Sequence, residues 1–131
     1  MEIRAKIWLE RDGLLLFGKG RAQLLRALDD EGSLAKAAKR LNMSYRAAWG
    51  KLKASEEHLG LRLAEPSPAG QRGMALTAEG RLILNEYEKL LRETERFFAR
   101  RLARFEAAAE AKRPQKQPPR AGTRGVSTTK A

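Results

Sequence analysis

Apolar and polar residues alternate along the first part of the chain. The alternation runs over residues 2–10 and has a period of two, which predicts a half-buried strand. Asp12 and Gly13 predict a tight turn, and the apolar run at 14–17 predicts the returning strand of a hairpin. Trp8 falls on the polar side of this pattern. We interpret it as packing under a neighbouring element, and a contact with a partner is the alternative.

The pattern then changes to the period of three to four that is typical of helices. Residues 19–31 predict a first helix with an apolar stripe of leucines, and Gly32 follows it as a stop signal. Ser33 is a suitable N-cap for a second helix over residues 34–41. Residues 42–43 then form a turn.

A third helix is predicted from Ser44, its N-cap, through residues 45–59 to Gly60. We expect its buried side to consist of Tyr45, Ala48, Trp49 and Leu52. The opposite side carries Ala47, Gly50 and Ala54, flanked by Arg46, Lys51 and Lys53. A glycine within a helix costs about 1 kcal/mol relative to alanine, so a functional reason is expected. Close approach to DNA is our interpretation, and close packing on another protein element is the alternative.

A wing and a long helix complete the pattern. Residues 61–64 and 74–76 predict two strands joined by a loop rich in proline and glycine, with Arg72 near the tip. Arg72 either enters a minor groove or is a solvated loop residue. Thr77 caps a helix that extends over residues 78–112.

The long helix repeats apolar residues every seven positions, and a core of this size cannot bury the whole stripe. We therefore expect its distal half to form a homodimer of the coiled-coil type. Folding back over the N-terminal hairpin is the alternative, and both can occur together. The expected dimer interface consists of Leu84, Tyr87, Leu91, Thr94, Phe98, Leu102 and Phe105.

Charge and composition narrow the function. The formal net charge is +11, which favours a polyanionic partner. The chain has no cysteine and a single histidine, His58, so we expect no metal site, no cofactor and no catalytic residues. No signal peptide or membrane span is recognisable, which predicts a cytoplasmic, nucleoid-associated protein. No nucleophile–base motif and no phosphate-binding glycine loop is recognisable either, so we do not expect an enzyme.

The composition changes again at residue 113. Residues 113–131 are rich in proline, glycine, serine and threonine, which predicts a disordered basic tail. The tail either adds nonspecific DNA affinity or only increases solubility. The domain prediction is therefore a winged helix-turn-helix domain over residues 1–112, followed by this tail.

The stretch GSLAKAAKRLNMSYRAAWGKL, residues 32–52, resembles the DNA-binding domain of ModE-type molybdate-responsive regulators. The stretch LTAEGRLIL, residues 76–84, is similar to the LysR-type winged helix-turn-helix. The resemblance implies a homodimeric transcriptional regulator that binds inverted repeats through its third helix. ModE-type proteins also carry oxyanion-binding domains, and this sequence shows none, so we expect no small-molecule effector to be bound by this chain alone.

These patterns predict a mainly α fold with small β hairpins, a winged helix-turn-helix with a long C-terminal dimerisation helix. The predicted function is sequence-specific binding of double-stranded DNA by a transcriptional regulator. The alternatives are a winged-helix protein-interaction module and a nonspecific nucleoid or RNA-binding protein. The expected DNA-binding residues are Ser33, Lys36, Ser44, Tyr45, Arg46, Ala47, Gly50, Lys51, Lys53 and Arg72.

Overall fold

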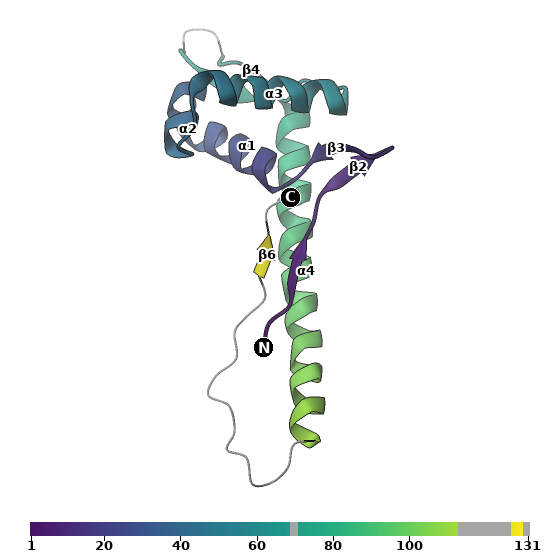
Figure 1. Cartoon of the computed structure of the whole chain (residues 1–131). Helices are drawn as coiled ribbons and strands as arrows, with labels where there is room; N and C mark the ends of the chain where they lie inside the picture. Colours follow the sequence, from purple (N-terminus) through teal and green to yellow (C-terminus); the bar gives the residue numbers. More distant parts are fainter. Residues whose placement is uncertain (69–70, 113–126, 130–131) are drawn as a thin grey trace.

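The computed structural model describes residues 1–68, 71–112 and 127–129. Three helices lie together at one end of the molecule: α1 (Lys19–Glu31), α2 (Leu34–Arg40) and α3 (Tyr45–Leu59) (Figure 1). They match the predicted ranges, except that α2 ends one residue earlier. Gly32 and Gly60 end α1 and α3 in the left-handed conformation, each with φ of 70°. Glycine adopts this conformation without the steric cost of a Cβ, which is why both helices stop there.

The N-terminal segment forms two short strands, β1 (Arg4–Lys6) and β2 (Leu9–Arg11), where one strand was expected. Between them, the carbonyl oxygen of Ile7 accepts a hydrogen bond of 2.7 Å from the hydroxyl of Tyr87. The predicted strand is thus interrupted at the point where its backbone bonds to a side chain of the long C-terminal helix. The predicted hairpin is confirmed, because β2 pairs antiparallel with β3 (Leu14–Phe17).

The wing consists of β4 (Ala64–Pro66) and β5 (Met74–Leu76), which pair antiparallel. The first of these strands begins at Ala64, the last residue of the predicted range 61–64. Leu63, just before it, donates its N–H to the Glu56 carboxylate at 2.8 Å and accepts the Thr77 N–H at 3.0 Å. The backbone of Leu63 is therefore hydrogen-bonded to α3 and to the residue that caps the next helix. The pairing of β4 with β5 starts at the following residue, Ala64.

The fourth helix, α4 (Ala78–Ala111), is 34 residues long. At 1.5 Å per residue it spans about 51 Å, and Figure 1 shows it extending well beyond the other helices. Thr77 caps it as predicted, since its hydroxyl oxygen accepts the Gly80 N–H at 2.9 Å. A Cβ on Gly80 would lie 2.1 Å from the carbonyl oxygen of Leu63, so only glycine lets α4 pass this close to the wing.

One hydrophobic core joins the helices, the hairpin and the wing. Ala37 of α2 and Ala48 of α3 are fully buried, and their small side chains let these two helices cross closely. Phe17 of the hairpin meets the ring of Tyr87 edge-on, with ring centres 5.3 Å apart. The largest fully buried side chains are Phe17, Leu24, Leu25, Leu28, Leu52, Leu63 and Leu84.

The first part of α4 belongs to this core, contrary to the expectation that it faces a second chain. Leu84 and Tyr87 are buried within the single chain, and Leu91 is half-buried against the same cluster. The alternative of packing against the N-terminal segment applies here, because Tyr87 contacts Ile7 and Phe17.

Further along α4 the expected interface residues differ in exposure. Leu102 is also buried in the single chain, whereas Thr94 and Phe98 are half-buried and Phe105 is exposed. Of the expected interface residues, Leu91, Thr94, Phe98 and Phe105 therefore retain surface for a second copy.

A third strand pair lies beside α4. Strand β6 (Ser127–Thr129) pairs parallel with β1, with Arg4 opposite Ser127 (Figure 1). The composition of the predicted disordered tail gave no sign of this strand. The rest of that tail, residues 113–126 and 130–131, lies outside the described residues. In the part of the chain that the structure describes, no helix is both long and apolar enough for a bilayer crossing.

Candidate nucleic-acid interface

The helix-turn-helix is formed by α2, a turn and α3. Each helix begins with a serine whose side-chain oxygen caps it. The Ser33 Oγ accepts the Lys36 N–H at 3.2 Å, and the Ser44 Oγ accepts the Ala47 N–H at 3.0 Å. Capping uses an acceptor site of each serine and leaves its hydroxyl hydrogen available as a donor. Donors at a helix N-terminus suit phosphate oxygens, because the helix dipole favours negative charge there.

The outward side of α3 has a shallow centre. Arg46, Ala47 and Gly50 are exposed, and Ala54 is half-buried. A Cβ built on Gly50 would meet no atom of the described residues within 4 Å, so packing among them does not explain this glycine. The cost of a glycine in the helix is therefore not offset by packing within the described residues. A backbone with no side chain at its centre can approach the floor of a groove closely.

Arg46 and Lys53 sit on this outward side, and their surroundings differ. No carboxylate pairs with Arg46 among the described residues. The ammonium of Lys53 lies 3.1 Å from a carboxylate oxygen of Glu56 and 4.4 Å from the ring centre of Trp49. Arg46 therefore presents an uncompensated guanidinium, while Lys53 is held in place by its neighbours.

Lys51 does not join this group. It is half-buried, and its ammonium would lie 3.3 Å from a Cβ on Gly20, at the start of α1. It lines a small hollow there with Leu15, Gly18 and Arg21. The structure therefore brings Arg46, Ala47, Gly50 and Lys53 together and places Lys51 on the side of α3 that faces α1.

Glu56 connects α3 to the wing. Its carboxylate accepts the backbone N–H of Leu63 at 2.8 Å and that of Ala64 at 3.4 Å, as well as a hydrogen bond from Lys53. Partial burial alone would raise the pKa of this carboxyl group, but these hydrogen bonds and the Lys53 charge lower the pKa below its ordinary value. The carboxylate thus fixes the start of the wing relative to α3.

Tyr45 and Trp49 were expected mainly in the core, and this expectation is wrong. Tyr45 is 54% exposed and Trp49 is 40% exposed. The buried stripe of α3 runs instead through Ala48, Leu52 and Ser55. Ser55 satisfies its hydroxyl by donating to the Lys51 carbonyl at 2.7 Å, which allows this polar residue to be buried. The prediction counted only apolar residues as buried, so it included Tyr45 and Trp49 in the buried side of α3 and left out the polar Ser55.

The remaining predicted contacts lie on other elements. Lys36 is exposed on α2, and Arg72 is exposed in the wing segment between β4 and β5. Figure 1 shows the wing at the same end of the molecule as α2 and α3. Basic side chains are thus exposed on α2, on α3 and in the wing, all at one end of the molecule, which suits a nucleic-acid duplex.

Residues 20–81 match the sequence model described as "Bacterial regulatory helix-turn-helix protein, lysR family". This range covers α1, α2, α3, the wing and the first residues of α4. The helix-turn-helix segment is of the LysR type. The architecture agrees with this assignment, because it is mainly helical with small antiparallel hairpins.

Solved structures of LysR-type DNA-binding domains resemble this chain. The CbnR DNA-binding domain in complex with DNA is 32% identical, with a TM-score of 0.51, over 69% of this chain and 95% of that one. Full-length CbnR, a LysR family transcriptional regulator, is also 32% identical with a TM-score of 0.51, but only 28% of its chain is covered. The BenM DNA-binding domain, at 24% identity and a TM-score of 0.50, supports the fold alone.

A curated relative is the molybdenum-pterin-binding protein MopB of Rhodobacter capsulatus. It is 33% identical over 81 residues, which cover 60% of this chain and 30% of MopB. The chain thus spans less than a third of the length of that protein.

Proposed function

We propose that this chain is a transcriptional regulator that binds double-stranded DNA through α3. The observation that carries the proposal is the outward side of α3, where Gly50 faces open space beside Arg46, whose guanidinium pairs with no carboxylate of the described residues. In helix-turn-helix proteins the recognition helix lies in the major groove with its N-terminal residues on the base edges. The similarity to a CbnR DNA-binding domain solved with DNA supports the same mode of binding.

In this proposal the residues have distinct tasks. Arg46 donates to a guanine, and Ala47 and Gly50 allow the helix to approach the base edges. Ser33, Lys36, Ser44 and Lys53 contact phosphates, Arg72 adds a contact from the wing, and the hydroxyl of Tyr45 can reach a phosphate. Lys51, which faces α1, takes part only through its charge.

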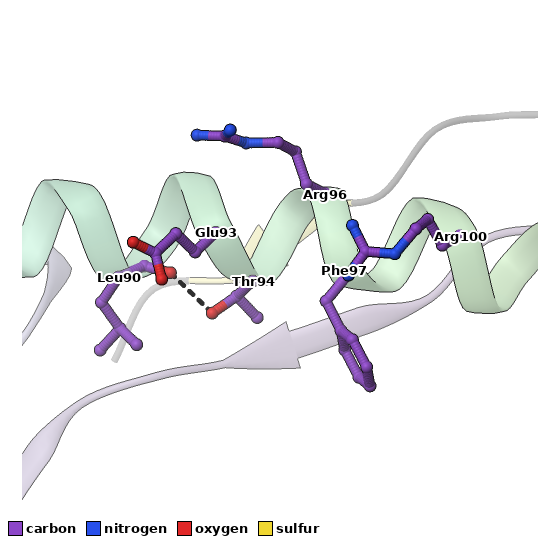
Figure 2. Close-up of a pocket in the computed structure, with 6 residues that line it drawn as sticks. All are labelled: Leu90, Glu93, Thr94, Arg96, Phe97 and Arg100. Atoms are coloured by element: carbon purple, nitrogen blue, oxygen red, sulfur yellow. Dashed lines mark hydrogen bonds between the residues drawn. The ribbon is translucent and has the colours of Figure 1, made fainter.

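We also propose that two copies bind an inverted repeat. Beyond the core, α4 carries exposed apolar residues that a second copy would cover: Leu90, Phe97 and Phe105. Figure 2 shows Leu90 and Phe97 pointing to the same side of α4, while Arg96 points away. Thr94 lies between them along an open hollow of about 450 Å³. Two recognition helices in such a dimer would lie about 34 Å apart, one turn of DNA.

A closer relationship to the ModE-type group is a further part of the proposal. The similarity to MopB and the hairpin that precedes α1 support it. We expect this chain alone to bind no molybdate, and equilibrium dialysis with molybdate measures this directly.

In vitro selection of duplexes from a random library tests the proposal. Enrichment of an inverted repeat supports a regulator of the proposed kind. Uniform retention of all duplexes would favour a general nucleoid or RNA-binding protein. No retention even at low salt would favour a protein-interaction module. Because electrostatic binding depends steeply on salt, the selection is run at two salt concentrations.

A further inference from the structure

Two aromatic side chains lie exposed on α3 beside the residues that we assign to base contacts. Tyr45 and Trp49 are four positions apart and therefore lie on the same side of the helix. They flank the side that carries Arg46 and Gly50. Neighbouring exposed aromatic rings with polar residues around them are a common feature of interaction sites.

The ring of Trp49 is held in a defined orientation. The Lys53 ammonium covers one face of the ring, 4.4 Å from its centre, and is itself held by Glu56 at 3.1 Å. Glu56 is fixed in turn by the backbone N–H groups of Leu63 and Ala64. The indole is thus held as a fixed apolar edge, and none of the described residues accepts a hydrogen bond from its N–H.

We propose that Trp49, with Tyr45 beside it, selects thymine by contacting its 5-methyl group in the major groove. This inference rests on the proposed function, because it requires α3 to lie in that groove. The thymine methyl group is the apolar feature of the major-groove edges, and apolar side chains recognise it by direct contact. Arg46 reads hydrogen-bond acceptors of a guanine, whereas the aromatic edge reads the methyl group, so the two contacts select different bases.

Replacement of thymine by deoxyuridine tests the inference, because it removes only the methyl group and keeps the base pair. Each thymine of the selected duplex is replaced in turn, and the dissociation constant of the wild-type protein is measured. We expect one thymine in each half-site at which the replacement weakens binding about fourfold, the effect of losing one buried methyl group.

Variants of Trp49 test whether its indole ring causes the preference for thymine over uridine. In Trp49→Ala the ratio of thymine to uridine affinity is expected to fall to about one, while Trp49→Phe, which keeps an apolar ring, retains part of it. Trp8→Ala is the matched control, because Trp8 is 41% exposed but lies outside α3. We expect this control to keep the wild-type ratio.

The outcomes separate the two proposals. If no duplex is enriched, the proposed function fails, and this inference fails with it. If a sequence is enriched but contains no thymine, or if uridine is tolerated at every position, only the inference is overturned. The same holds if Trp49→Ala keeps the wild-type ratio. The wild-type measurements need no variant, so a folding defect in Trp49→Ala cannot hide a negative result.

Discussion

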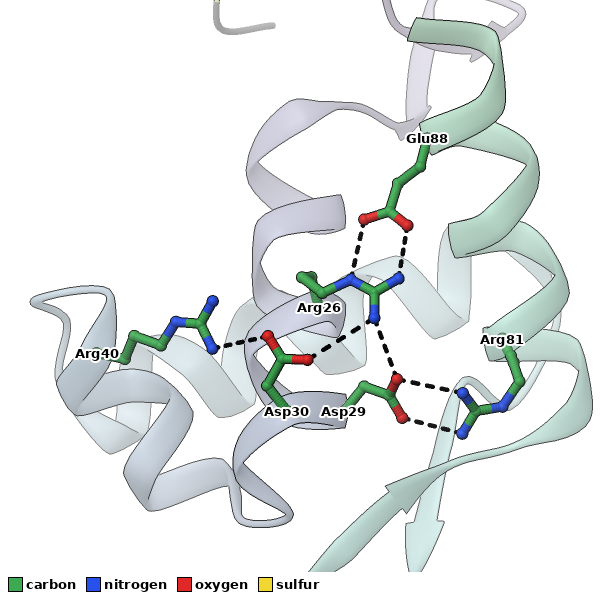
Figure 3. Close-up of polar contacts among 6 residues, drawn as sticks. All are labelled: Arg26, Asp29, Asp30, Arg40, Arg81 and Glu88. Atoms are coloured by element: carbon green, nitrogen blue, oxygen red, sulfur yellow. Dashed lines mark hydrogen bonds and ion pairs between the residues drawn. The ribbon is translucent and has the colours of Figure 1, made fainter. Parts of the chain in front are cut away.

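The guanidinium of Arg26 in α1 holds both carboxylate oxygens of Glu88 in α4. The Nε to Oε2 distance is 3.0 Å and the Nη2 to Oε1 distance is 2.6 Å. The Glu88 hydrogen bond raises the pKa of Arg26 against the effect of partial burial. Figure 3 shows this pair at the centre of a cluster that joins α1, α2 and α4 and also contains Asp29, Asp30, Arg40 and Arg81. The direction of α4 is thereby fixed relative to the helix-turn-helix.

The Arg26–Glu88 pair is expected to contribute about 1 kcal/mol of coupling energy to stability, because it is bidentate yet partly exposed. A double-mutant cycle of Arg26→Ala and Glu88→Ala, followed by urea unfolding, measures it. The coupling should decrease at high salt. Strictly additive effects of the two substitutions would show that the pair adds nothing to stability.

Gly50→Ala is expected to stabilise the protein and weaken its DNA binding. The added Cβ meets open space, so the helix gains about 1 kcal/mol from alanine. The same methyl group would separate α3 from the base edges, and we expect roughly tenfold weaker binding to the selected site. Thermal unfolding and titration with the selected duplex measure the two effects.

Gly80→Ala provides the contrast within the same fold. Its Cβ would lie 2.1 Å from the Leu63 carbonyl oxygen, a backbone atom, so we expect a loss of about 3 kcal/mol or more. Unaltered DNA affinity in Gly50→Ala would mean that the exposed glycine has no role in close approach.

These two glycines illustrate what the sequence could and could not predict. The helix boundaries followed from local signals: the serine and threonine caps, the stop signals Gly32 and Gly60, and the period of the leucines. The exposed position of Gly50 also followed from the helical period. The tight contact of Gly80 with Leu63 did not, because it depends on how two distant segments pack.

Two predictions about which side chains are buried were wrong, because each depended on contacts that the sequence pattern does not reveal. Tyr45 and Trp49 were placed in the core because they are apolar, while the polar Ser55 is buried through a hydrogen bond to its own helix. Leu84 and Tyr87 were placed at a dimer interface because the core appeared too small to cover them. For Tyr87 the N-terminal segment supplies cover, through the hydrogen bond to Ile7 and the edge-on contact with Phe17, which lie far away in the sequence.

Glu56→Gln is expected to reduce stability at neutral pH by about 1–2 kcal/mol, because the charged carboxylate accepts backbone hydrogen bonds from Leu63 and Ala64. The pKa of Glu56 is lower in the folded chain than its ordinary value of 4.5. Its stabilising effect is therefore complete above pH 4.5 and is lost as the pH falls through the lower, folded pKa.

The wild-type advantage over Glu56→Gln should shrink below about pH 4.5, and urea unfolding at pH 7 and pH 3.5 measures this change. Glu57→Gln is the matched control, because Glu57 is the next residue and is exposed. A difference that stays constant with pH would argue against a titrating contact at Glu56.

Phe97→Glu is expected to convert the proposed dimer into a monomer. Phe97 is 50% exposed, and Phe97→Glu removes its apolar ring and places a charge at the proposed contact, where burying it is costly even with Arg100 nearby. Sedimentation equilibrium measures the molecular mass. Leu14→Glu, at an exposed position of the N-terminal hairpin, is the control and should stay dimeric. Identical masses for both variants would place the interface elsewhere.

Arg46→Ala is expected to cost about 1–3 kcal/mol on the selected site and to relax selectivity at one base position, because a bidentate guanine contact is lost. Lys36→Ala should instead weaken binding to all sequences alike and reduce the salt dependence by about one unit. Lys36 suits this comparison better than Lys53, whose ammonium is already paired with Glu56. Titrations with selected and random duplexes at several salt concentrations measure both effects. Equal losses of Arg46→Ala on the two duplexes would remove Arg46 from base recognition and assign it to the phosphate backbone.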